Sequence, residues 1–252
     1  MKLIKTLFLL VLSFFAAVVN ANQIKIAVAS NFTQTMKFIV DEFEKETNTK
    51  VKASYASSGK LYAQIHHGAP YHLFFSADQN KPLKLIQSGL ADPDSRYTYA
   101  LGQLVLWSNK TDLQTQVQNL LKDGKYNKLA LANAKLAPYG LAAQQVLNNL
   151  GLVPSSRTKW VQGENISQTY QFIATGNADL GFIANSQLQL SDSSKPKSIW
   201  QVPVELYSPV KQDMVLLLTA KRNPAALRFM QFIHSAKVKT IIESNGYITA
   251  IN

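Results

Sequence analysis

Ala29-Ser30-Asn31-Phe32-Thr33 and Ala56-Ser57-Ser58-Gly59-Lys60 are the two stretches that decide the fold. Each follows an alternating run typical of a strand, at 24–29 and 51–55, and precedes apolar residues at helical spacing. The start of a helix leaves four backbone N–H groups unpaired and carries a partial positive charge, so hydroxyl residues placed there add further donors. The sequence therefore predicts two strand–turn–helix units whose turns can hold an anion without a cation.

The same alternation of strand and helix continues along the chain. Strands are expected at 73–76, 128–132 and 180–184, and helices at 61–67, 81–87, 141–150, 166–175 and from Pro224 onward. Gly89, Gly151 and Gly176 follow three of these helices, as expected for helix ends. This order favours an α/β fold in which helices cover both faces of a sheet.

Two longer extended runs interrupt the alternation, at 96–107 and at 202–215, the second with Pro203 and Pro209 inside it. Two such crossings predict a first lobe made from both ends of the chain, 22–100 and 208–252, and a second lobe inserted at 101–207. Ligands commonly bind in the space between two lobes. We therefore expect a binding cleft there.

Residues 1–21 have the pattern of a secretory signal peptide. Lys2 and Lys5 precede an apolar run at 7–19, and Val19-Asn20-Ala21 resembles a cleavage site that would leave Asn22 as the first mature residue. The chain has no cysteine, which excludes a lipid anchor at the cleavage site, disulfides and thiolate metal sites. The sequence therefore predicts a protein of the periplasm of a Gram-negative cell.

The chain is basic, with a formal net charge of +11 of which the signal peptide carries two. Its lysines are scattered rather than clustered, which is typical of a solvated basic surface. Such a surface also attracts small anions. Nucleic-acid binding is disfavoured, because no zinc-finger spacing or RNP-type motif occurs and the chain is predicted to be secreted.

Four turns bring polar residues to the start of a predicted helix. They are Ser30-Asn31, Ser58-Gly59, Pro138-Tyr139-Gly140 and Gly163-Glu164-Asn165-Ile166. A Ser or Asn before one helix is most often only a cap. Because all four turns occupy corresponding places in the strand–helix units, we expect four helix starts to face a single space.

These motifs carry a resemblance to a known family. Ala27-Val28-Ala29-Ser30-Asn31-Phe32-Thr33, Ala56-Ser57-Ser58-Gly59-Lys60-Leu61, the run from Gly68 to Asp78, Leu136-Ala137-Pro138-Tyr139-Gly140 and Gly163-Glu164-Asn165-Ile166 occur in this order. The chain resembles the periplasmic molybdate-binding proteins of ABC-type uptake systems over essentially its whole mature length. The resemblance implies a two-lobed type II periplasmic binding protein fold, a molybdate or tungstate ligand delivered to an ABC permease with its ATPase, no cofactor and a monomer.

The resemblance also implies roles for single residues. Ser30 should contribute its hydroxyl and N–H group, Asn31 a further donor and Ser58 its hydroxyl, while Tyr139 and Ile166 should act mainly through backbone N–H groups. One position departs from the pattern, because better-known members carry a tyrosine, whose phenol contacts the oxyanion, where this chain has Ala184. The hydroxyl of Tyr139 is the candidate replacement.

The donors in the four turns also limit the ligand. Hydroxyls and N–H groups are neutral donors and favour a fully deprotonated dianion, whereas a protonated oxyanion needs an acceptor, and Glu164 is the one carboxylate in these turns. Molybdate or tungstate is therefore expected rather than phosphate. A receptor for sulfate or an organic anion stays open as an alternative.

An enzyme is the other alternative. Ser57-Ser58-Gly59-Lys60 matches the Ser-x-x-Lys motif of penicillin-recognising serine enzymes, but the companion Ser-Asp-Asn and Lys-Thr-Gly motifs are absent from the sequence. We therefore expect a binding protein. Other residues have ordinary interpretations: exposed helix-end histidines at His66-His67, core anchors at Trp107, Trp160 and Trp200, a helix cap at Asp78 and a surface loop at 189–198.

Overall fold

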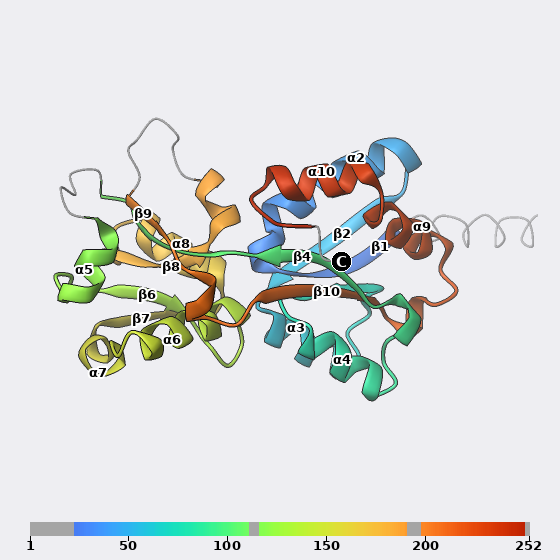
Figure 1. Cartoon of the computed structure of the whole chain (residues 1–252). Coiled ribbons are helices and arrows are strands. Elements are labelled where there is room, and N and C mark those ends of the chain that lie inside the picture. The colour runs from blue at the N-terminus through green and yellow to red at the C-terminus, as the bar shows by residue number, and fades with distance from the viewer. Residues whose placement is uncertain (1–22, 111–115, 191–197, 250–252) are drawn as a thin grey trace, which may run out of the picture.

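The computed structural model describes residues 23–110, 116–190 and 198–249. The predicted signal peptide and most of the predicted loop at 189–198 lie outside these residues. The described chain forms two lobes that lie side by side, each built on a mixed sheet of five strands (Figure 1). Among the described helices, none is both long enough and apolar enough to cross a membrane.

Lobe 1 is the part built on the sheet with strand order β2-β1-β3-β10-β4. Strands β1, β2 and β3 are parallel, whereas β10 pairs antiparallel with both β3 and β4. The strands are β1 (Gln23–Ala29), β2 (Lys50–Ala56), β3 (Leu73–Phe75), β4 (Tyr97–Gly102) and β10 (Val210–Leu216). The helices are α2 (Thr33–Thr47), α3 (Ser58–His66), α4 (Asn80–Gln87), α9 (Pro224–Ile233) and α10 (Ala236–Ser244).

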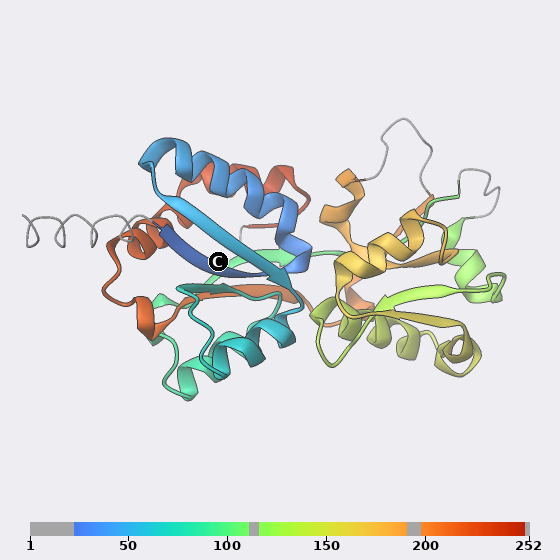
Figure 2. The same cartoon turned by 180° about the vertical axis from the view of Figure 1, so that it is seen from behind.

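The alternation of side chains along β1 explains how helices cover both faces of this sheet. Ile24, Ile26 and Val28 are buried in one core with α2, α9 and α10, whereas Ala27 is buried in another core with α3 and α4. The two groups of helices lie on opposite sides of the sheet in both views (Figures 1 and 2). The predicted α/β layering is thereby confirmed for lobe 1.

Lobe 2 is the part built on the sheet with strand order β7-β6-β8-β5-β9. Alternate residues of β5 again divide the packing, because Leu104 and Leu106 share a core with α5 and α6, whereas Val105 and Trp107 pack with α8. The strands are β5 (Leu104–Ser108), β6 (Leu129–Ala132), β7 (Trp160–Gly163), β8 (Leu180–Ala184) and β9 (Ser198–Gln201). The helices are α5 (Val117–Asp123), α6 (Pro138–Asn149), α7 (Val153–Ser156) and α8 (Ile166–Ala174).

The chain crosses between the two sheets twice. It passes from β4 to β5 through a single residue, Gln103, and returns between the end of β9 and the start of β10. The second crossing differs from the expected extended run at 202–215, because residues 204–206 form a short 3-10 helix, η5 (Val204–Leu206), before β10 begins. Pro203 and Pro209 lack the N–H group that a strand ladder requires, which explains why the strand begins only at Val210. The predicted lobe limits at 100/101 and 207/208 stay predictions.

Two helices begin earlier than the sequence predicts. Helix α3 starts at Ser58 and α6 at Pro138, so that Ser58 and Tyr139 lie in the first turn rather than before it. Proline is favoured at the first helical position, because it has no N–H group to leave unpaired. Short strands β7 and β9 were not predicted. The remaining 3-10 helices are η1 (Ser30–Phe32), η2 (Pro93–Ser95), η3 (Arg157–Lys159), η4 (Asn185–Leu190) and η6 (Leu218–Ala220).

Several single-residue expectations are confirmed. The Asp78 carboxylate accepts a hydrogen bond from the Lys81 N–H group in the first turn of α4, at 3.0 Å, as a cap does. Trp107 is buried and stacks on Tyr170 with a centroid distance of 5.2 Å. Trp160 and Trp200 are partly buried against the core of lobe 2, and His66 and His67 are exposed.

Candidate anion-binding site

The four turns singled out in the sequence come together where the lobes meet. The Gly59 N–H group of α3 donates to the Leu136 carbonyl just before α6, at 2.9 Å. The Ser167 hydroxyl of α8 donates to the Ser30 carbonyl of η1 at 3.0 Å. Lys60 of α3 pairs with Glu164, which precedes α8, at 3.1 Å. These three contacts join both turns of lobe 1 and both turns of lobe 2 in one continuous series.

Some backbone N–H groups of these turns are hydrogen-bonded within the protein, and others are unpaired. The Asn165 side chain accepts from the Ser167 and Gln168 N–H groups, and the Ser57 hydroxyl accepts from that of Lys60. Within the described chain, these caps and the contacts above leave no partner for the N–H groups of Ser30, Asn31, Ser58, Tyr139 and Ile166. Each unpaired N–H group lies in the first turn of its helix, where the helix dipole favours negative charge.

Lobe 1 adds serine hydroxyls to its backbone donors. Ser30 and Ser58 are buried, with 7% and 1% of their surface exposed. The Ser58 hydroxyl oxygen accepts from the Ala77 N–H group at 2.9 Å, which leaves its proton directed elsewhere. A serine hydroxyl that accepts from one side and donates to the other is suited to an oxyanion.

The Asn31 side chain is engaged within the protein, and the prediction that Asn31 adds a donor stays a prediction. Its amide nitrogen donates to the Gln212 side-chain oxygen at 2.8 Å and to the Tyr247 hydroxyl at 3.0 Å. An amide nitrogen has two hydrogens, so both are engaged within the protein. In this arrangement Asn31 offers a ligand only its backbone N–H group.

The Tyr139 side chain reaches a neighbour that the sequence analysis did not consider. Its hydroxyl accepts from the Gln212 side-chain nitrogen at 3.3 Å, next to Gly102 at the end of β4. A Cβ atom at Gly102 would overlap this hydroxyl, so the glycine makes the approach possible. The prediction that the Tyr139 hydroxyl contacts the ligand stays a prediction.

Three buried tyrosines surround Gln212 and Asn31. Burial raises the pKa of the Tyr99 and Tyr139 hydroxyls well above the ordinary value, and it also raises that of Tyr247. All three groups therefore stay protonated and neutral at physiological pH. The site holds dipoles rather than fixed charges at its centre.

Three of the cations near the site are paired with carboxylates. Lys60 pairs with Glu164 and Lys81 with Asp78, while Arg96 holds the buried Asp213 at 2.6 Å. Because Lys60 pairs with Glu164, and the Ser57 hydroxyl caps α3, the Ser-x-x-Lys arrangement lacks a lysine poised to activate a serine. Among the described residues, no cluster of three or more His, Cys, Asp or Glu side chains is placed to hold a metal ion.

The sequence family described as "Bacterial extracellular solute-binding protein" matches residues 24–248, which is nearly all of the described chain. This chain belongs to that family. The two sheets and the two crossings are thus those of a solute-binding protein.

Two curated relatives are similar over almost their whole length. The molybdate-binding protein ModA of Azotobacter vinelandii is 43% identical over 232 residues, which cover 92% of each chain. The protein of the same name from Rhodobacter capsulatus is 41% identical over 91% of this chain and 89% of its own. Among solved structures, the periplasmic molybdate-binding protein of A. vinelandii matches with a TM-score of 0.86 and 38% identity, over 90% of this chain and 100% of that one. This match confirms the two-lobed fold predicted from the resemblance.

Sequence reasoning missed several residues of this solute-binding protein that support the site. Gln212 is fully buried and contacts Asn31, Tyr99 and Tyr139. The available signal was the polar pair Gln212-Asp213 inside the apolar run that ends β10, because such residues are buried only when they are hydrogen-bonded. Ser186 and Tyr247 carried no comparable signal, although the Tyr247 hydroxyl donates to the Asn31 carbonyl at 2.8 Å.

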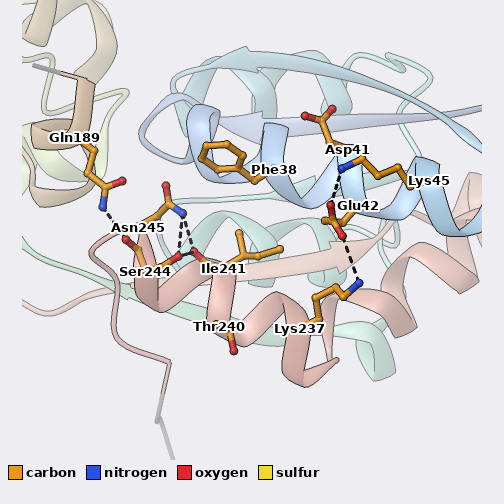
Figure 3. A pocket seen from close by; sticks show the side chains of 10 residues that line it. All are labelled: Phe38, Asp41, Glu42, Lys45, Gln189, Lys237, Thr240, Ile241, Ser244 and Asn245. Carbon is orange, nitrogen blue, oxygen red and sulfur yellow. Dashed lines mark hydrogen bonds and ion pairs between the residues drawn. The ribbon is translucent and has the colours of Figure 1, made fainter.

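A larger pocket lies elsewhere on the surface, between α2 and α10 (Figure 3). It has a volume of about 750 Å³ and is lined by exposed Phe38, by Ile241 and by the ion pairs that Glu42 makes with Lys45 and Lys237. It contains none of the four helix starts. Two smaller pockets of about 220 and 260 Å³ adjoin the four turns, one at Ser30 and Ser167 and the other at Ala77 and Pro138.

Proposed function

We propose that this chain captures molybdate, or tungstate, and delivers it to an ABC permease with its ATPase. The observation that carries the proposal is the set of unpaired N–H groups at four helix starts, two starts in each lobe, joined by contacts across the interface. The proposed ligand-binding residues are Ser30, Asn31, Ser58, Tyr139 and Ile166. The similarity to proteins named for molybdate binding supports the choice of ligand.

The charge of the ligand follows from the donors. Neutral hydroxyls and N–H groups stabilise a dianion through fixed dipoles, with no cation to desolvate. A hydrogen phosphate would need a free acceptor for its proton, and Glu164 is paired with Lys60. The donors thus favour a fully deprotonated oxyanion, and the proposal includes neither a cofactor nor a catalytic step.

The proposal also includes where the protein acts. The pattern at 1–21 supports export to the periplasm, and a monomer is sufficient because both halves of the site come from one chain. The lobes each hold only half of the donors, so the ligand stabilises the closed arrangement. A closed, loaded receptor is the form that a permease can distinguish from an empty one.

A thermal-shift screen of the mature chain tests the proposal. Molybdate, tungstate, sulfate, phosphate and chromate are added separately at equal concentrations. A ligand that binds only the native state raises the free energy of unfolding by about 2.7 kcal/mol at one hundred times its dissociation constant. We expect large shifts with molybdate and tungstate and small ones with the others.

The controls decide between the alternatives. The Ser30→Ala variant should lose most of the shift, which ties the effect to the proposed site rather than to ionic strength. A dominant shift with sulfate would replace molybdate by sulfate as the ligand. A covalent serine adduct with a β-lactam or fluorophosphonate probe would support an enzyme instead.

A further inference from the structure

Gln212 is the residue of β10 that connects the two halves of the site. It is fully buried, and the pairing of β10 with β4 is irregular beside it, because Gln212 faces Ala100 while Asp213 faces Thr98. Tyr99 is thus an extra residue in β4, as in a β-bulge, a feature that re-aims side chains near functional sites. The result is that Tyr99 of lobe 1, Asn31 of lobe 1 and Tyr139 of lobe 2 all bond to one carboxamide.

The donors and acceptors of these four side chains are incompletely matched. The Asn31 amide nitrogen donates both of its hydrogens, to Gln212 and to Tyr247, so the remaining polar atom of its carboxamide is an oxygen. The Tyr139 hydroxyl accepts from Gln212, but its own proton has no acceptor among the described residues. The Tyr99 hydroxyl has one proton for two acceptors, the Ser76 carbonyl at 3.1 Å and the Gln212 oxygen at 3.2 Å.

A second order of hydrogen bonds, in which donors and acceptors are exchanged, is possible with the same atom positions. A carboxamide turned by 180° exchanges its donor and acceptor corners without moving the residue. If Asn31 and Gln212 both turn, the Gln212 nitrogen donates to the Asn31 oxygen and to the Tyr99 hydroxyl. The Tyr99 hydroxyl then donates only to the Ser76 carbonyl, and the Tyr139 hydroxyl donates to the Gln212 oxygen. The Asn31 side-chain oxygen can accept from the Tyr247 hydroxyl, while the Ser186 hydroxyl donates to the Asn31 backbone carbonyl.

We propose that binding of a dianionic oxyanion selects this second order, and that Gln212 is the positioning residue that holds Asn31 in it. In the second order the Asn31 amide nitrogen is released from Gln212 and Tyr247, so that it can donate to the oxyanion. An oxyanion is repelled by the oxygen and bonded by the nitrogen. The inference rests on the proposed function and deepens it, because it assigns the site's donor selectivity to a residue that does not itself touch the ligand.

The role of the Tyr139 hydroxyl follows from the same scheme. In the second order this hydroxyl donates to Gln212 and stabilises the turned pair, so it acts through Gln212 and not by direct contact with the ligand. Gly102 leaves room for that contact at the crossing between the lobes. The missing phenol at Ala184 is then compensated by the Asn31 amide.

A double-mutant cycle on molybdate affinity, measured by calorimetry, tests this route. Gln212→Met should weaken binding about tenfold or more, the effect of losing one hydrogen bond to a charged ligand. Tyr139→Phe should weaken binding in the wild-type background but cost nothing further in Gln212→Met, because its partner is already gone. Gln64→Met, which changes an exposed glutamine of α3, is the matched control and should bind as the wild type does.

The outcomes separate the inference from the proposed function. Equal costs of Tyr139→Phe in both backgrounds would mean that the hydroxyl contacts the ligand independently, which overturns the route. Wild-type affinity in Gln212→Met would overturn the positioning role. If Gln212→Met does not fold, Gln212→Glu replaces it, since a carboxyl side chain of nearly the same shape has no N–H group to offer Asn31; it too must lose affinity. A wild-type chain that binds none of the oxyanions contradicts the proposed function instead.

Discussion

The two lobes supply the proposed site by different means. Lobe 1 contributes Ser30 and Ser58, whose hydroxyls add to the N–H groups of their own helix starts. Lobe 2 contributes Tyr139 and Ile166, whose side chains are buried in its core while their N–H groups stay unpaired. The donors of lobe 1 therefore depend on residue type, and those of lobe 2 depend on backbone conformation. Substitutions in the two lobes should obey different rules.

Removal of both serine hydroxyls should have the largest effect. Ser30→Ala and Ser58→Ala each delete a hydrogen bond to a charged ligand, worth about 1.5–3 kcal/mol or roughly ten- to 150-fold in affinity. The double variant should lose about a hundredfold or more if the two effects add. Calorimetry with molybdate measures both.

Two controls accompany this prediction. Ser155→Ala, at an exposed serine of α7, should leave the affinity unchanged. Ser58→Ala also removes the acceptor for the Ala77 N–H group, so its melting temperature should fall even without ligand. Unchanged affinity in both single variants would remove the two serine hydroxyls from the site.

Ile166 allows a direct test of whether the donors of lobe 2 depend on backbone conformation. Ile166→Pro deletes the N–H group at the first position of α8, where proline is tolerated, and Asn165 before it is already extended at φ −143° and ψ 173°. We expect a loss of roughly ten- to 150-fold. Ile166→Val keeps the N–H group and should bind within about threefold of the wild type, a difference of less than about 1 kcal/mol.

The proline and valine variants must differ for the comparison to stand. Circular dichroism and the melting temperature without ligand check that α8 is intact in the proline variant. If valine weakens binding as much as proline does, lobe 2 also depends on residue type, and the distinction between the lobes fails.

The ion pair across the interface should matter less. Lys60 and Glu164 are about half exposed, with 50% and 42% of their side-chain surface accessible. Exposed pairs contribute at most about 1 kcal/mol, so Glu164→Gln should weaken binding by at most about fivefold. The difference from the wild type should shrink as salt is added. A tenfold loss that persists at high salt would show that Glu164 does more than pair with Lys60.

The smallest effect concerns pH and is confined to lobe 1, which contains all four histidines of the chain. Burial lowers the pKa of His72, whose Nδ1 atom accepts from the Lys25 N–H group at 3.2 Å. A histidine with a lowered pKa in the folded state binds more protons when unfolded. The free energy of unfolding should therefore fall as the pH drops through the ordinary histidine pKa of about 6.5.

Chemical denaturation between pH 7 and pH 5 measures this slope. His72→Gln should reduce it, and His234→Gln should do the same, because burial lowers the pKa of His234 as well. An unchanged slope in both variants would exclude a contribution of these histidines. Molybdate affinity should be unaffected by either substitution, since neither residue lies at the four helix starts.

The sequence determined more about lobe 1 than about lobe 2. Strands β1 and β2 and the hydroxyls after them were predicted, because alternation of apolar residues and the preference of serine for helix starts are local signals. Pro138 and the polar turn before Ile166 were also visible. The starts of α3 and α6 were placed three residues late, because their first turns show no amphipathic pattern.

Tertiary structure alone decided how these pieces make a site. Two of the contacts between the turns join residues more than a hundred positions apart, Ser30 with Ser167 and Lys60 with Glu164. The bulge opposite Gln212 arises from pairing between β4 and β10, which no local pattern encodes. Donor residues can be predicted from the sequence wherever a residue type prefers a particular local conformation. Which of those donors stay unpaired, and which way the Asn31 amide turns, depends on partners that only the folded chain brings within hydrogen-bond distance.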